Sequence, residues 1–326
     1  MHNSRPGYEL PWMFHPTQLV DDLEQAGEWF QRVFGRHRVT WAERWDLSQL
    51  SPEYPVDYSF WIMIGEVVHD VICPALYKVD GDAVPWGEHS GLSGISWWVK
   101  NSSAFAAAIE AKGLTLIDQA GQPVRGGRFA RSLLTDEFTL MSMKADEAGF
   151  PHTFSEILGA SKDRFAHVDH RLGDGWHLAS ASPQDPLGII GCAWQTLSTV
   201  DIERAKWLFT EVLDGQYLGQ ARDAAGAGDA HCVFCAHTVI ELVGPRGTAP
   251  VDAAAADTFD SITLLVQDLD KVRAHLNACD IRTTLDEADI IRTDPRDCMG
   301  VTWGFTRRLA PADPRVTMPA WAALTR

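Results

Sequence analysis

The chain lacks a long hydrophobic segment. No apolar run in its 326 residues approaches the ~18–20 residues that a membrane-spanning helix needs. The first residues, MHNSRPGYELPW, also lack the charged region and the following apolar region of a secretory signal. These absences predict a cytoplasmic protein without a membrane partner.

Basic residues are also scarce. The 28 Lys and Arg residues stand against 44 Asp and Glu residues, which gives a formal net charge of −16. Proteins that bind nucleic acid usually meet the phosphate backbone with clustered Lys and Arg side chains, and the sequence contains no such stripe. Nucleic acid is therefore not an expected partner.

The six cysteines lack the spacing of a disulfide framework or of a zinc site. They are scattered, and the C-x-x-C at 232–235 has no second pair nearby. We interpret them as reduced core residues. The 13 tryptophans are instead an excess. Large aromatic rings suit a cavity for a flat or apolar ligand, although most such rings simply fill cores.

One pattern occurs four times along the chain: an alternating apolar strand, an acidic or amide helix cap, and an amphipathic helix. A side-chain oxygen at the cap satisfies free backbone N–H groups at the start of a helix. Further strand-like runs follow each helix, so each copy is predicted to be a βαβββ module. The predicted caps are Asp22, Asn101, Asp201 and Asp268.

The spacing of the caps divides the modules into two pairs. The second interval between caps is longer than the first, and the surplus falls in a polar segment that contains several glycines and prolines, as domain linkers do. Two domains of two modules each are therefore predicted. Their expected boundaries are 8–85 and 86–157 for the modules of the first domain, 158–186 for the linker, and 187–250 and 251–326 for the modules of the second domain.

Two sequence motifs accompany the modules. A strand runs into V-x-D-L-E-x-A or a shorter form of it at 20–26 and 266–270, and a later strand of the type G-x-x-x-x-E-L-x-x-P occurs at 65–74 and 236–245. With these motifs the chain resembles the vicinal oxygen chelate superfamily, which includes glyoxalase I, bleomycin-resistance proteins, methylmalonyl-CoA epimerase and type I extradiol dioxygenases. The resemblance implies an α+β fold in which four βαβββ modules pair into two cup-shaped, incompletely closed barrels.

The resemblance also implies a metal site. In the superfamily the ligands come from the first and last strands of each module, and the first-strand ligand stands seven residues before the helix cap. This rule gives His15 and Asp70 in module one and Glu156 in module two, where His152 is an alternative. His15, Asp70 and Glu156 would suit a divalent Fe, Mn, Zn or Mg ion.

The remaining equivalent positions are Gly94, Trp194 and Ser261 on first strands and Glu241 and Gly304 on last strands. Only Glu241 could bind a metal there, so the second domain is expected to have no metal site. This differs from the extradiol dioxygenases, whose iron lies in the second domain and is held by two histidines and a carboxylate. The difference argues against ring cleavage.

Two of the proposed ligands also have ordinary structural explanations. A lone histidine on an apolar strand, such as His15, is often a hydrogen-bonded core residue. Asp70 lies within WIMIGEVVHDVICP, where burial of an unpaired acid would be costly, so a metal, an arginine or a polar cavity must lie beside it.

The activity implied by the resemblance is a metal-dependent reaction on a small, hydrophobic or aromatic substrate with adjacent oxygens. The ion would act as a Lewis acid and Glu156 as the base, in a glyoxalase-like lyase or isomerase reaction or a related hydrolysis. Tyr58, Trp61, Trp97 and Trp98 are predicted to line the substrate cavity. The alternatives are an Fe(II) ring-cleaving dioxygenase and a metal-free ligand-binding protein of the bleomycin-resistance type. The chain is expected to be a monomer or a homodimer.

Overall fold

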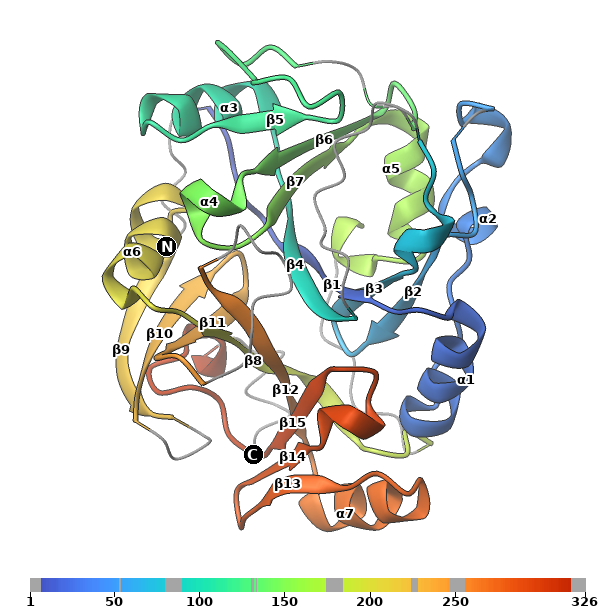
Figure 1. Ribbon diagram of the computed structural model, residues 1–326, viewed down its shortest axis with the longest axis vertical. Helices are drawn as coiled ribbons and strands as arrows, with labels where there is room; N and C mark the ends of the chain where they lie inside the picture. The colour runs from blue at the N-terminus through green and yellow to red at the C-terminus, as the bar shows by residue number, and fades with distance from the viewer. Residues whose placement is uncertain are drawn as a thin grey trace.

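Two mixed β-sheets, one from each half of the chain, make up the fold (Figure 1). The structure is a computed structural model, and it describes residues 7–52, 54–79, 90–129, 132, 134–173, 184–223, 228–246 and 256–317.

The first sheet has seven strands in the order β2-β3-β1-β4-β7-β6-β5. Its two modules join where β1 pairs antiparallel with β4. Helix α1 (Leu23–Phe34) follows β1, and α3 (Ser102–Ala111) follows β4. The strands are β1 (Met13–Leu19), β2 (Ser59–Ile64), β3 (Val67–Ile72), β4 (Gly91–Trp98), β5 (Leu116–Asp118), β6 (Phe138–Met143) and β7 (His152–Ile157).

The second sheet has eight strands in the order β13-β14-β15-β12-β8-β11-β10-β9, and here β8 pairs antiparallel with β12. Its strands are β8 (Ile189–Ser198), β9 (Gln216–Arg222), β10 (Asp229–Cys235), β11 (Thr238–Val243), β12 (Thr258–Val266), β13 (Thr283–Asp286), β14 (Ile290–Thr293) and β15 (Thr302–Thr306). Its main helices are α6 (Ile202–Trp207), which continues as a π-helical turn over Leu208–Val212, and α7 (Leu269–Ala278). The predicted α+β fold class is confirmed.

The four predicted helix caps are confirmed as well. In each module the capping side chain accepts hydrogen bonds from backbone N–H groups of the first helical turn, so the same local chemistry starts all four helices. The capping residues are Asp22, Asn101, Asp201 and Asp268.

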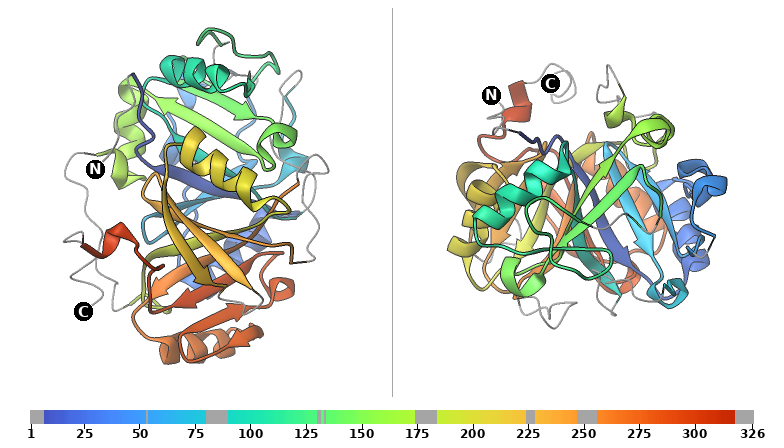
Figure 2. Two further views of the ribbon diagram at one scale, coloured as in Figure 1. Left: turned by 90° about the vertical axis from the view of Figure 1, so that its left-hand side faces the viewer. Right: turned by 90° about the horizontal axis from the view of Figure 1, so that it is seen from above.

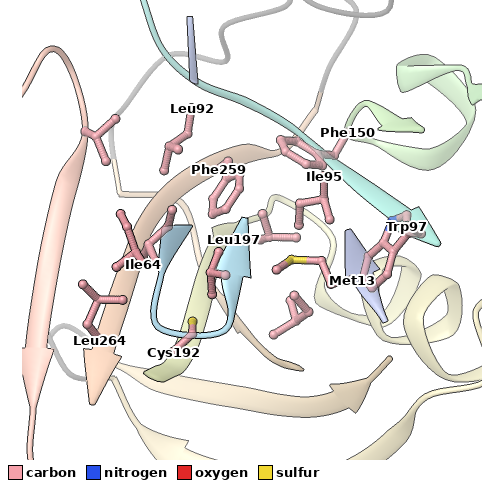
Figure 3. Packing of buried hydrophobic residues seen from close by; sticks show 14 of the residues in the cluster. Met13, Ile64, Leu92, Ile95, Trp97, Phe150, Cys192, Leu197, Phe259 and Leu264 are labelled. Atoms are coloured by element: carbon pink, nitrogen blue, oxygen red, sulfur yellow. The ribbon is translucent and has the colours of Figure 1, made fainter. Parts of the chain in front are cut away.

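The main hydrophobic core lies between the two domains. Because successive side chains of a strand point to opposite faces, one face of each sheet packs against the other domain and the opposite face carries its own cluster. Figure 3 shows residues of both halves, such as Met13, Trp97, Leu197 and Phe259, within the shared core. The views in Figure 2 show the two halves as layers in broad contact. Each cup therefore lies on the side of its sheet that faces away from the partner domain.

A short Asp-x-Arg segment fastens the chain back onto the first sheet. Arg171 donates from Nη1 to the carbonyl oxygen of Met13 at 2.8 Å and from Nη2 to that of Phe14 at 2.9 Å. The buried carboxylate of Asp169 pairs with the Arg171 guanidinium at 2.7 Å. Together with α5 (Gly159–Ala166), this segment packs on the first sheet, although it was predicted to be linker. Residues 174–183 of that predicted linker lie outside the described residues.

The second domain repeats this device. Arg315 donates to the carbonyl oxygens of Cys192 and Ala193 at 2.8 and 2.6 Å, and it pairs with Asp313 at 2.7 Å. Each segment therefore holds the two residues that directly precede His15 in the first domain or its equivalent, Trp194, in the second. The repeat unit of each domain includes a closing Asp-x-Arg that sequence analysis missed.

Replacing Arg315 by leucine should lower the free energy of unfolding by about 3–5 kcal/mol, because the buried Asp313 carboxylate loses its cation. Urea denaturation of the two proteins measures the difference. The matched control is Arg308→Leu, which breaks an exposed pair with Asp289 and should change the stability by less than about 1 kcal/mol. Equal effects of the two replacements would show that the Asp-x-Arg segment does not secure the domain.

Candidate functional site

The first cup encloses a cavity of about 100 Å³. Strands β1, β4 and β7 supply polar side chains, which are His15, Thr17, Ser96, Thr153 and Ser155. Helix α5 and the short helix α2 (Trp41–Arg44) lie across the cup and supply much of its aromatic wall. The aromatic lining consists of Phe14, Trp41, Trp45, Trp61, Phe138 and Phe165.

His15 lies on β1 and lines this cavity. A register shift between Met13 and His15 lets Phe14 share the same side of the sheet. The imidazole Nδ1 lies 3.3 Å from the Thr17 hydroxyl, and Nε2 lies 3.8 Å from Oδ2 of Asp70. Burial, together with the nearby His69 and Arg44, lowers the pKa of His15 to about 3. The ring is therefore neutral at physiological pH.

Asp70 lies on β3, in register with Thr17 of β1 and Trp61 of β2. Its Oδ1 is buried and has no hydrogen-bond partner. Burial raises the pKa of Asp70 to about 7, against the opposing positive charge of Arg44. The carboxyl group can therefore hold or release a proton near neutral pH.

Arg44 is the cation of the site. It ends α2 and is only 2 % exposed. Its guanidinium lies 4.6 Å from the ring centroids of both Trp41 and Trp61, and Nη2 donates to the carbonyl oxygen of Ser59 at 3.0 Å. Burial lowers the pKa of Arg44 to about 10, so the group stays protonated at neutral pH.

The structure does not bring Glu156 to this site. Its carboxylate accepts hydrogen bonds from the backbone N–H groups of Asn101 and Ser102 at 2.8 and 2.9 Å and from the Ser102 hydroxyl at 2.6 Å. Glu156 therefore binds the start of α3, on the other side of the sheet from His15. The prediction that it is a third ligand and the catalytic base is corrected accordingly.

The register of the last strand explains this correction. In module one Asp70 pairs with Thr17, and the corresponding pair in module two is Thr153 with Ser96. Glu156 comes three residues later, and an odd offset turns a side chain to the opposite face of a strand. Its alternative, His152, has the same orientation for the same reason.

The predicted aromatic residues divide between the two faces of the sheet. Trp61 lines the cavity, while Tyr58 and Trp98 belong to the same cluster behind its wall. Trp97 lies in the core between the domains, where its indole N–H donates to Nδ1 of His152 at 3.0 Å. Where a strand is regular, adjacent residues point to opposite faces, so only one of Trp97 and Trp98 could point into the cup.

The donor set does not fit a metal centre with three protein ligands. Within the described ranges, no group of three His, Cys, Asp or Glu side chains is placed to hold an ion. His15 and Asp70 supply two donors, and Thr153 supplies only a hydroxyl. At Gly94 a Cβ would lie 3.1 Å from the carbonyl oxygen of Pro151, so a ligand side chain there would require the chain just before β7 to shift by a few tenths of an ångström. Protein sites for zinc and similar ions usually use three or four side chains.

The second cup keeps the register but has different chemistry. Glu241 on β11 pairs with Thr196 of β8, as Asp70 pairs with Thr17. Its carboxylate accepts a hydrogen bond from the Thr196 hydroxyl at 2.7 Å, and burial raises its pKa. Trp194 occupies the position that corresponds to His15. Among its described residues this cup therefore has an acid with a tryptophan, and not a histidine, at the position of His15.

The part of the site that lies on α2 and α5, which are not elements of the repeated βαβββ pattern, was not predicted from the sequence. The missed cavity residues on α2, at its C-cap and on α5 are Trp41, Arg44, Trp45 and Phe165. The first three stand in the run Trp-Ala-Glu-Arg-Trp, in which Arg44 follows Trp41 by three residues and so lies within helical reach of it. That run is the signal that could have identified them.

Comparisons with known proteins agree with this architecture. Residues 15–130 match the family model of the Glyoxalase/Bleomycin resistance protein/Dioxygenase superfamily. No curated protein sequence gives a significant match. No helix within the described part of the chain is long and apolar enough to cross a membrane.

Several solved structures share the fold across nearly the whole chain. The 2,3-dioxygenase LapB from Pseudomonas sp. KL28 is 12% identical, with a TM-score of 0.55 over 91% of this chain and 92% of that one. The Mn(II)-bound glyoxalase from Novosphingobium aromaticivorans is 12% identical, with a TM-score of 0.57 over 92% and 82%. Homoprotocatechuate 2,3-dioxygenase from Arthrobacter globiformis is 13% identical, with a TM-score of 0.53 over 94% and 82%. At these identities the likeness concerns the fold.

Asp70→Asn should become more stable relative to the wild type as the pH rises. Burial raises the pKa of Asp70 from 3.8 to about 7 in the folded state. The protonated carboxyl group therefore contributes its full share to the free energy of unfolding below about pH 4, and this share is lost as the pH rises through 7. Between pH 5 and pH 8 the stability difference should shift in favour of the variant by up to about 3 kcal/mol.

Urea unfolding at both pH values measures this shift, and the exposed Asp289→Asn serves as the control. A shift in the opposite direction would mean that the Asp70 carboxylate is stabilised as an anion, as a tightly bound cation would do.

Proposed function

We propose that the chain belongs to the vicinal oxygen chelate superfamily and that it is an enzyme whose active site is the first cup. The match of residues 15–130 to the Glyoxalase/Bleomycin resistance protein/Dioxygenase model and the fold along the chain support this. The observation that supports this most strongly is the proximity of His15 to Asp70, whose Nε2 and Oδ2 atoms lie 3.8 Å apart beside an aromatic cavity. Titratable groups with strongly shifted pKa values in a cavity are typical of catalytic sites.

The walls of the cavity indicate the kind of substrate. Phe14, Trp61 and Phe165 present aromatic faces, and the ring centroids of Trp61 and Phe165 lie 5.1 Å apart. Aromatic walls favour flat, apolar molecules, while a few polar groups fix their orientation. We therefore assign the cavity to a small substrate that carries an aromatic or similarly apolar group.

The polar groups support proton transfer as the chemistry. Thr17 and His15 both line the cavity and contact each other, and Asp70 lies behind His15. A neutral imidazole can accept a proton at one nitrogen while it gives up a proton from the other. A carboxyl group with a pKa near 7 can then take or supply that proton. Isomerase or lyase reactions that remove a proton beside a carbonyl group fit this arrangement.

A second candidate is a metal-free ligand-binding protein. The set of only two strong donors and the enclosing aromatic wall favour it. It predicts binding without turnover. A ring-cleaving dioxygenase is less well supported, because the described residues of the first cup supply no third ligand and Trp194 stands in the second cup where the first has His15.

The enzyme proposal predicts that the protein accelerates exchange between solvent deuterium and the acidic C–H of small aryl-substituted keto acids such as phenylpyruvate. His15→Gln and Asp70→Asn should each reduce the exchange at least 100-fold, because general acid–base groups contribute about 10²–10⁴-fold. Mass spectrometry measures the deuterium uptake. Glu241→Gln changes the equivalent acid of the second cup and should retain the wild-type rate.

Two outcomes would contradict this prediction. Binding of such compounds without exchange above the background rate would favour the ligand-binding protein. In the second outcome, a chelator abolishes the exchange, one divalent ion restores it, and His15→Ala and Asp70→Ala lose the bound metal. These results would favour the metal-dependent enzyme that the resemblance implies.

A further inference from the structure

The four buried arginines of the described residues differ in how their charge is balanced. Arg171, Arg292 and Arg315 each lie within 2.8 Å of an aspartate oxygen. Arg44, the fourth, has no carboxylate oxygen within 4.0 Å among the described residues. Burial of an unpaired charge is costly, so proteins usually pair it. Arg44 is therefore a buried cation without a protein counter-ion in contact.

We propose that Arg44 is the anion-binding group of the first cup, and that the substrate is an aromatic molecule that bears a carboxylate or a comparable anionic oxygen group. This inference rests on the proposed function, because it takes the cavity as the substrate site. It places in the cup a side-chain cation where the superfamily uses a metal ion.

The contacts of Arg44 leave donors for a ligand. Nε donates to the carbonyl oxygen of Thr40 at 3.3 Å, and Nη2 donates to the backbone and hydroxyl oxygens of Ser59 at 3.0 and 3.3 Å. Nη1 makes no hydrogen bond to the described residues, and Arg44 lines the cavity. A guanidinium presents five N–H donors in one plane, which suits the two oxygens of a carboxylate.

The surroundings of Arg44 hold it in place. The two tryptophan rings that contact it, Trp41 and Trp61, limit its rotation and attract its charge. A cation fixed in advance binds an anion at a lower entropic cost than a mobile one does.

The remaining acid in the site does not cancel this charge. Asp70 is close enough to influence Arg44 electrostatically, but the two form no ion pair. Asp70 instead approaches His15. Among the described residues, the cavity thus combines an aromatic wall with a cation that has no carboxylate in contact, and an aryl carboxylate complements both.

Isothermal titration calorimetry with benzoate and with its neutral isostere benzamide tests the inference. The wild type should bind benzoate at least tenfold more tightly than benzamide. Arg44→Met should weaken benzoate binding at least tenfold and change benzamide binding less than twofold. Arg38→Met is the matched control, because Arg38 pairs with Glu24 and does not line this cavity. It should bind both probes as the wild type does.

A more conservative variant covers the case in which Arg44→Met does not fold. Arg44→Lys keeps the charge but loses the planar pair of donors, and it should bind benzoate several-fold more weakly than the wild type, with benzamide binding unchanged. Thermal melting of each variant, followed by circular dichroism, verifies folding.

The possible failures are distinguishable. In one outcome, the wild type binds benzoate and benzamide with equal affinity, and neither Arg44→Met nor Arg44→Lys changes these affinities. That result would overturn the role of Arg44 and leave the cavity as the substrate site. In the other outcome, a Trp61→Ala replacement leaves the binding of both probes unchanged. That result would place the ligand outside the cavity and overturn the proposed function as well.

Discussion

The antiparallel pairing of first strands, β1 with β4 and β8 with β12, is the constraint on which the rest of the structure depends. It joins two modules into each sheet and fixes which side chains face the cup. The opposite face of each sheet is buried against the other domain, so no side chain on these strands can change face without loss of the core. The positions of His15 and Asp70 follow directly from this pairing.

The two cups show how one scaffold supports different electrostatics. In the second cup Arg292 pairs with Asp260, and Glu241 is hydrogen-bonded to Thr196, so these buried ionisable groups have partners. The Trp194 indole N–H and the Ser261 hydroxyl have none among the described residues. In the first cup, within the described ranges, Arg44 has no carboxylate in contact and Oδ1 of Asp70 has no hydrogen-bond partner. Unsatisfied buried charged groups cost stability, and a bound ligand can complete them. The asymmetry between the cups therefore points to the first as the working site.

Sequence reasoning succeeded where the repeat determines the structure. The helix caps and the positions of His15, Asp70 and Glu241 follow from a regular strand and a fixed distance to the cap. It failed at Glu156 because the irregular segment between β5 and β6, and the short helix α4 (Ala145–Ala148) before β7, conceal the register of the last strand. A three-residue error there reverses the face. Arg44 was missed because α2 belongs to no repeat, and its role depends on contacts that only the folded chain creates.

The most direct test of the account is a crystal structure of the protein with 4-bromobenzoate, in which anomalous scattering locates the bromine. The account predicts a bromine peak inside the first cup, with the carboxylate on the Arg44 guanidinium and the ring against Trp61 and Phe165. The account would be contradicted by a ligand that binds only outside the first cup. It would also be contradicted by a ligand held in the cup through a metal ion between His15 and Asp70, with its carboxylate turned away from Arg44.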